Sequence, residues 1–553
     1  MRVTRHPKRI LHPGWLAAVV ACLVLTTAQA QPAHVRQSLH EFVRSPDNLW
    51  SLIRGVAVMR QRNAAPKDSA EYRTSWEYWA AIHGYPGATS PFGTIEQTKQ
   101  RLLAGAPLDA PLFEGFFSGL ENLTPPSEPA GLAQSIWSTC KHSSQTEQAV
   151  HFLSWHRMYL YFFERVLRDA SGDPSFALPY WDYTNPTVDP ADPANAPSRI
   201  PVAFVADVPV DVGSGPVPNP LFERRRTAGF GRSVHLDVVR TDIDATLAID
   251  TFVDFQATLE GGIHGFIHCA VGNRCLAPYI GLVPFAGADP VFWHHHANID
   301  RIWSCWSKRY GVDRNPINDM DWMSEEFHFV NERGDPVSMK VGELFDPAGR
   351  IDYAYDNDAD CSRQPPVVEM AAMTGVFSEE NAQIRVSSDV ASANDVAITA
   401  VEQSIELEQA SLASPEMLLL AMRPTTVAPT KATLRLIGVQ TDREPGASIN
   451  VFLTDSETER RVFVGVIGFF ALFDHQANGE GRGRDLSYDV SGQLQELSAD
   501  AQTTDQVRVL LEASTGLTGD DAEIDAGRYA ESGIRIKRVT LEVETSSQVF
   551  DLK

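Results

Sequence analysis

The chain has 553 residues, is 43% hydrophobic and 21% charged, and carries a formal net charge of −24. This length exceeds one ordinary domain, so we expect two. The acidic balance argues against nucleic acid as a partner, because a phosphate backbone requires a basic face, and it disfavours a polyanionic substrate.

The first thirty residues have the features of a targeting segment. Four basic side chains lie within residues 2–9, a mostly apolar run covers 15–27, and Ala-Gln-Ala at 28–30 is a small-residue cleavage pattern. We expect residues 1–30 to be a removed secretory signal peptide, and the mature chain to be exported to the periplasm or the medium without stable membrane insertion. Lipoprotein processing at Cys22, which follows Val-Val-Ala, is the alternative.

Three early helices are predicted, at 48–62, 75–82 and 151–169. The second ends at His83, before Gly-Tyr-Pro. The third carries aromatic residues on several faces, as a core helix does, so its histidine and arginine need partners. Between residues 185 and 250 the chain becomes proline-rich, which predicts a long surface excursion with short strands.

A helical pattern returns after residue 251 and brings together residues that suit a metal. His264 and His268 are four apart, so they share one helix face. The triple histidine 294–296 follows on a further helix and can add a third ligand. Three neutral imidazoles without thiolate or carboxylate suit copper or zinc. The simpler alternative is a pair of polar residues on a solvated helix face.

Five cysteines remain after residue 30, too few for a disulfide scaffold. Cys269 and Cys275 are close enough in sequence to close a small loop in an oxidising compartment, or they are buried small hydrophobes. The odd number leaves at least one cysteine unpaired or modified.

Several motifs now match one family in chain order. The chain resembles the binuclear (type 3) copper proteins, which include tyrosinases, catechol oxidases and other polyphenol oxidases. The carrying motifs are Ile82-His-Gly, Cys140-x-His-Ser-Ser, Phe152-x-x-Trp-His-Arg, His264-x3-His268, Asp289-Pro-Val-Phe-Trp-x-His-His-x-Asn-x-Asp-Arg and Tyr353-Ala-Tyr.

The resemblance implies a mainly α catalytic domain at 31–362, a four-helix bundle that holds two copper ions through three histidines each. It assigns His83, His142 and His156 to copper A, and His264, His268 and His296 to copper B. His295, Asn298 and Asp300 would be outer-shell partners that fix ring orientation, and His294 an extra histidine.

The activity implied is oxidation of phenols by O2, with o-diphenols converted to o-quinones and monophenols hydroxylated at the ortho position in some members. The alternatives are an o-aminophenol oxidase and an oxygen carrier of the hemocyanin type.

The second copper A ligand has two candidates in the sequence. His142 lies fourteen residues before His156, where the family usually has nine, so we expect a five-residue insertion. His151 is the competitor, although five residues is a poor spacing for one helix face. If His142 is the ligand, the resemblance implies a thioether bond between it and Cys140.

Four further positions resemble the family's substrate machinery. Glu260 corresponds to the glutamate that helps hold a water which deprotonates monophenols, but Gly265 replaces the usual companion asparagine, which favours o-diphenol oxidation. Val283 corresponds to the gate residue, and its small side chain should leave the mouth open. Phe292 should contact a substrate ring, unless it is an ordinary core phenylalanine.

The last third of the chain changes character. We expect a linker at 363–430 and a smaller all-β domain at 431–553, because alternating apolar segments with turn residues between them predict an antiparallel sandwich or barrel. This part weakly resembles the C-terminal domain of plant polyphenol oxidases, which caps the copper site. A stability or oligomerisation domain is the alternative.

Overall fold

The computed structural model describes residues 34–85, 132–142, 150–187, 196–277, 279–346, 350–357, 384–409, 431–455, 460–472, 483–498, 507–519 and 523–547, with a few isolated positions besides. The expected signal peptide lies outside these residues. Among the helices described, none is both long and apolar enough to cross a membrane.

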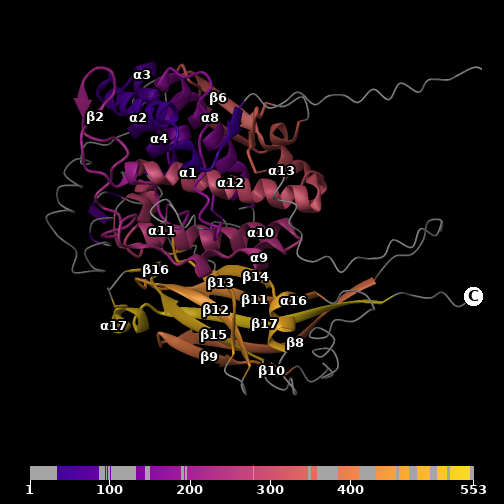
Figure 1. Ribbon diagram of the computed structural model, residues 1–553. Coiled ribbons are helices and arrows are strands. Elements are labelled where there is room, and N and C mark those ends of the chain that lie inside the picture. Colours follow the sequence, from indigo (N-terminus) through magenta and orange to yellow (C-terminus); the bar gives the residue numbers. More distant parts are fainter. Residues whose placement is uncertain are drawn as a thin grey trace, which may run out of the picture.

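A helical domain forms one half of the molecule and a β domain the other (Figure 1). The principal helices of the first are α2 (Pro46–Gln61), α4 (Trp76–His83), α8 (Phe152–Ser171), α10 (Phe252–Leu259), α11 (Gly265–Val271) and α12 (Pro290–Tyr310). Shorter helices are α1 (Leu39–Phe42), α3 (Ala70–Arg73), α7 (Leu132–Ile136), α9 (Asp244–Leu247) and α13 (Met320–Ser324). The predicted early helices are thus present, each within two residues of its predicted ends.

Local sequence explains where the long helices begin and end. Ser45 accepts a hydrogen bond from the Asn48 amide at the start of α2, and Asp289 does the same for Val291 at the start of α12; a proline follows each cap. Helix α8 ends at Gly172, which has φ +70°, a conformation that glycine adopts without strain. Two of these helices, α8 and α12, carry histidines of the cluster described below.

Short strands complete the helical domain. Strand β1 (His34–Arg36) pairs with β7 (Tyr353–Tyr355), and β5 (Glu326–Val330) pairs with β6 (Pro336–Lys340). The proline-rich excursion contains β2 (Val210–Asp211), β3 (Pro216–Val217) and β4 (His235–Leu236), as its composition predicted.

The β domain is an antiparallel sandwich. One sheet has the order β10-β8-β17-β11-β14 and the other β13-β12-β15-β9, and apolar residues from both sheets form one buried cluster. The strands are β8 (Ile384–Ile398), β9 (Glu402–Glu406), β10 (Glu408–Gln409), β11 (Lys431–Gln440), β12 (Ser448–Asp455), β13 (Arg461–Ile467), β14 (Arg484–Asp489), β15 (Val507–Ser514) and β17 (Ile534–Ser547), with helices α16 (Ser491–Ser498) and α17 (Ala526–Ala530).

The predicted linker boundary was wrong in one respect. Residues 384–409, which we expected within the linker, form β8, β9 and β10, and β8 pairs with β17 along most of its length. The Ala/Ser/Glu-rich composition of this stretch hides the strands, because β8 and β9 pair with β17 and β15, which lie more than a hundred residues further on. The remainder of the expected linker falls outside the described residues.

The two domains are joined by hydrogen bonds as well as by packing. The Gly468 amide donates to the Gly261 carbonyl at 2.7 Å, and the Ser487 amide donates to the Thr258 hydroxyl at 2.8 Å. Strand β16 (Leu517–Thr518) pairs with β4 of the helical domain. The edge formed by β13 and β14 therefore lies directly against α10 and α11 (Figure 1).

Candidate metal centre

Histidines from four helices and one loop converge in the centre of the helical domain. The contributing elements are α4, the loop after α7, the second turn of α8, the α10–α11 segment and α12. The residues are His83, His142, His156, His264, His268, His295 and His296, and all are buried.

These side chains form three overlapping groups whose potential ligand atoms lie within 4.8 Å of one another. One group is His264, His268, His295 and His296; the second is His83, Cys140 and His142; the third is His83, His156 and His296. The His156 and His296 rings stack with centroids 4.4 Å apart, so the groups adjoin. Each group has the donor atoms to hold a metal ion.

Hydrogen bonds at Nδ1 prepare four of these rings as metal ligands. The Nδ1 atoms of His83, His156, His264 and His268 donate to the carbonyls of Val283, Phe152, Glu260 and Ile280, at 3.0, 2.7, 3.1 and 2.6 Å. A carbonyl only accepts, so the proton is on Nδ1 and the Nε2 lone pair faces the centre. Within the described part of the chain, the buried Nε2 atoms of His83 and His264 have no hydrogen-bond partner, as expected of atoms that bind an ion.

Burial also keeps these imidazoles neutral. Desolvation, followed by the neighbouring histidines, lowers the pKa of His83, His156, His264 and His296 well below the usual value. Neutral imidazole is the form that binds a metal. The donor set therefore fits copper or zinc.

The structure brings His142, and not His151, to the centre. The His142 Nδ1–H donates to Glu260 Oε1 at 3.0 Å, and its Nε2 lies 3.1 Å from Cys140 Sγ. His151 instead stacks on Trp322 at the start of α8, with ring planes 8° apart. Burial lowers the pKa of His151 to about 4. Cys140 is a free thiol, whereas Cys269 and Cys275 form a disulfide, as their spacing allowed.

The three consecutive histidines of α12 have different surroundings. His294 turns away and shares a hydrogen bond with the Pro179 carbonyl at 2.8 Å. His295 shares one with the Tyr183 hydroxyl at 2.9 Å, and its ring stays within the four-histidine group. The helical repeat separates successive side chains by about a hundred degrees, so one run of histidines serves several sites.

Of the expected outer-shell partners, Asp300 acts elsewhere. Its carboxylate accepts hydrogen bonds from Arg157, Arg36 and the hydroxyls of Tyr353 and Tyr355, which joins β1 and β7 to α12. This is a correction, because those bonds orient the helix and not a ligand ring. Asn298 accepts a hydrogen bond from Arg301 through Oδ1, and its buried Nδ2 has no hydrogen-bond partner among the described residues, so it does not orient a ligand ring through a hydrogen bond.

The expected substrate contacts are buried. Phe292 packs against the rings of His83 and His296, with centroids 4.8 and 4.3 Å apart, and is fully buried. Val283 is also fully buried. The small side chain of Val283 therefore does not leave an open mouth in this structure.

Three residues of the β domain reach the centre, and sequence reasoning did not find them. The Phe470 ring stacks on His268, with centroids 3.7 Å apart and planes 6° apart. The Arg484 guanidinium lies 3.6 Å from Glu260 Oε1. Gly468 packs on Gly265, and a Cβ atom added to Gly265 would lie 3.3 Å from the Gly468 Cα. No local pattern marks them, because their partners are some two hundred residues away in sequence.

The Gly265 contact supplies a steric reason for this glycine. A side chain at 265 would press on the backbone of the β domain, and a side chain at 468 would collide with the backbone at 265 and 266. Glycine at both positions is what lets the two backbones meet.

Comparison with known proteins gives consistent results. The family model "Common central domain of tyrosinase" matches residues 73–309, and "Polyphenol oxidase middle domain" matches 316–364. The chain is 26% identical over 524 residues to the tyrosinase HcTyr1 of Hahella sp. (strain CCB-MM4), covering 90% of this chain and 98% of the relative. It is 32% identical over 241 residues to the latent polyphenol oxidase of Prunus armeniaca, covering 37% of each.

Solved structures resemble it over both domains. A latent aurone synthase has a TM-score of 0.53 at 17% identity, covering 94% of this chain and 91% of the other. A latent apple tyrosinase has a TM-score of 0.51 at 18% identity, covering 94% and 98%. At these identities the likeness concerns the fold.

Proposed function

Because the chain belongs to the tyrosinase and polyphenol oxidase family of oxidoreductases, we propose that its histidine cluster binds two copper ions and oxidises phenols with O2. The preferred reaction is the conversion of o-diphenols to o-quinones. The observation that carries the proposal is the convergence of buried, neutral imidazoles whose Nδ1 atoms are held by carbonyls.

We propose the ligands as two triads: His83, His142 and His156 for the first ion, and His264, His268 and His296 for the second. When bound, two copper ions would supply the electrons that reduce O2 and a positive charge that favours a phenolate. Zinc has no redox step to offer. The thioether between Cys140 and His142 remains a prediction, supported by the 3.1 Å between Cys140 Sγ and His142 Nε2.

The protein's own residues would handle the ring and the proton. Phe292 would contact a substrate ring, and its packing between His83 and His296 supports this role. Glu260 is fully buried and bonded to His142, so it is placed to position a water or to take a phenolic proton near the first ion. Exclusion of bulk water by the aromatic surroundings strengthens these interactions.

We also propose that the β domain keeps the enzyme latent. Phe470 occupies the face of His268 where a phenol ring would have to lie, so substrate entry requires displacement of the β domain. We further propose that the protein is exported, as the first thirty residues suggest.

The test is oxygen uptake by the copper-loaded chain without residues 1–30, with a catechol and the matching monophenol, before and after proteolysis between residues 358 and 383. Uptake with catechol after cleavage supports the proposal. Uptake with the monophenol, without a long lag, would show that Glu260 suffices for hydroxylation. The absence of uptake with any phenol would refute phenol oxidation, and an o-aminophenol in the same panel tests the alternative oxidase.

A further inference from the structure

Arg484, the first residue of β14, is a charged side chain in an unusual position. It is 3% exposed, and its side chain lies across Gly261, where an added Cβ would collide with the Arg484 Cδ. All three of its guanidinium nitrogens are buried without a hydrogen-bond partner among the residues that the structure describes. Its counter-charge is Glu260, whose Oε1 lies 3.6 Å from Nη2.

Burying a guanidinium without hydrogen bonds is costly, and the cost falls when an opposite charge is near. Burial lowers the pKa of Arg484, and the Coulombic attraction of Glu260 opposes that shift. Glu260 belongs to the helical domain and Arg484 to the β domain. In the closed arrangement, the Glu260 carboxylate is thus the group that lies opposite the buried Arg484 guanidinium.

We propose that Arg484 is a positioning residue that acts on Glu260, so that one carboxylate has two mutually exclusive roles. With the β domain docked, Glu260 neutralises Arg484 and holds the cover closed. With the β domain displaced, Arg484 leaves and Glu260 is free to act on substrate. The inference rests on the role proposed above for Glu260. It adds that docking of the β domain depends on the Glu260 carboxylate and keeps that carboxylate from acting on substrate.

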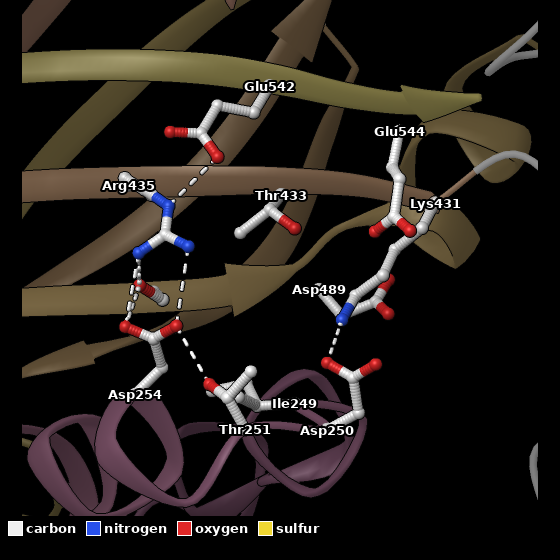
Figure 2. A pocket seen from close by; sticks show the side chains of 11 residues that line it. Ile249, Asp250, Thr251, Asp254, Lys431, Thr433, Arg435, Asp489, Glu542 and Glu544 are labelled. Atoms are coloured by element: carbon white, nitrogen blue, oxygen red, sulfur yellow. Dashed lines mark hydrogen bonds and ion pairs between the residues drawn. The ribbon is translucent and has the colours of Figure 1, made fainter. Parts of the chain in front are cut away.

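Other ion pairs cross the same domain boundary and differ in kind. Lys431 pairs with Asp250 at 2.5 Å, and Arg435 pairs with Asp254 at 3.1 Å (Figure 2). These side chains are 21–31% exposed, so water screens the attraction between them and solvates their charges when the domains separate. Asp250 is therefore a matched control for Glu260: an acidic residue of the same boundary whose partner is not buried.

The experiment measures opening without copper or substrate. Hydrogen–deuterium exchange of the peptide containing Gly468 reports it, because the Gly468 amide bonds to the Gly261 carbonyl only when the domains are docked. Amides of β12, in the core of the β domain, report whether each variant is folded. The full chain is compared with Glu260→Gln, Arg484→Met, the double variant and Asp250→Asn.

The expected pattern is specific to a buried charge pair. Glu260→Gln strands the guanidinium and should raise the exchange rate of the Gly468 peptide on the order of a hundredfold or more. Arg484→Met should also raise it, because Glu260 loses its counter-charge. The double variant should return to within about tenfold of the wild type, since an uncharged pair has no stranded charge. Asp250→Asn should change the rate by less than about tenfold.

Two results would overturn the inference. Wild-type exchange in Glu260→Gln would mean that the charge does not hold the domains together. Exchange in the double variant as fast as in Glu260→Gln would mean that loss of shape, and not of charge balance, opens the boundary. The exchange measurement uses the metal-free chain and is independent of the oxygen-uptake assay. If no variant oxidised phenols, the proposed function would be refuted, but the exchange rates would still test the Arg484–Glu260 pair.

Discussion

Replacing Phe470 by alanine should convert the intact chain from a covered enzyme to an active one. The ring stacks on His268 at 3.7 Å and packs edge-on to His264 at 5.7 Å, and the residue is 2% exposed. Phe470 belongs to the hydrophobic cluster of the helical domain, although the β domain supplies it. Its removal vacates a ring-sized space at the proposed metal site.

The magnitude follows from burial. Truncating a buried phenylalanine costs about 3–5 kcal/mol, and most of these contacts exist only when the domains are docked. Each 1.4 kcal/mol is about a factor of ten, so the open fraction should rise on the order of a hundredfold or more, until the open form predominates. Oxygen uptake with catechol, measured on the copper-loaded full chain without proteolysis, should rise at least about tenfold.

Phe469→Ala is the matched control. Phe469 is fully buried as well, but it belongs to the hydrophobic cluster of the β domain itself. The Phe469→Ala substitution should lower the melting temperature about as much as Phe470→Ala does, but it should not expose the proposed metal site. No gain of uptake in Phe470→Ala, or an equal gain in Phe469→Ala, would refute the idea that the Phe470 ring itself excludes substrate.

Three further predictions concern the site. His142→Ala should lower the copper content of the loaded chain by one ion and His151→Ala should not, as metal analysis would show; equal losses would contradict the ligand assignment. Gly265→Asn should speed amide exchange at Gly468, because the new side chain meets the β-domain backbone; unchanged exchange would show that the backbones can part locally. In the copper-loaded chain, mass spectrometry of the peptide spanning 140–142 should give a mass two hydrogen atoms below that of the unlinked sequence. The Cys140→Ser substitution should abolish that deficit. A full unlinked mass in the wild type would exclude the thioether.

Much of the helical domain could be predicted because its signals are local. The Ser45 and Asp289 caps, and the glycine after α8, fix helix ends within a few residues of the side chains they act on. The four-residue spacing of His264 and His268 places both rings on one side of the chain. The alternation of apolar and polar residues along β11 likewise predicted a half-buried strand.

Other features depended on pairings that no local period records. Strand β8 was hidden in a polar stretch because β17, its partner, is far away in sequence. His142 and His151 could be ranked by spacing alone, but only the packed chain shows one beside Glu260 and the other on Trp322.

The long helices, the presence of a β domain and the set of histidines able to bind metal follow from the sequence alone, because periodicity, capping and residue chemistry act over a few residues. What covers the histidines depends on the packing of the two domains. Phe470, Gly468 and Arg484 meet His268, Gly265 and Glu260 because the surfaces of the two domains fit together. Such a fit is a property of shapes and charges about two hundred residues apart, and neither segment carries it alone.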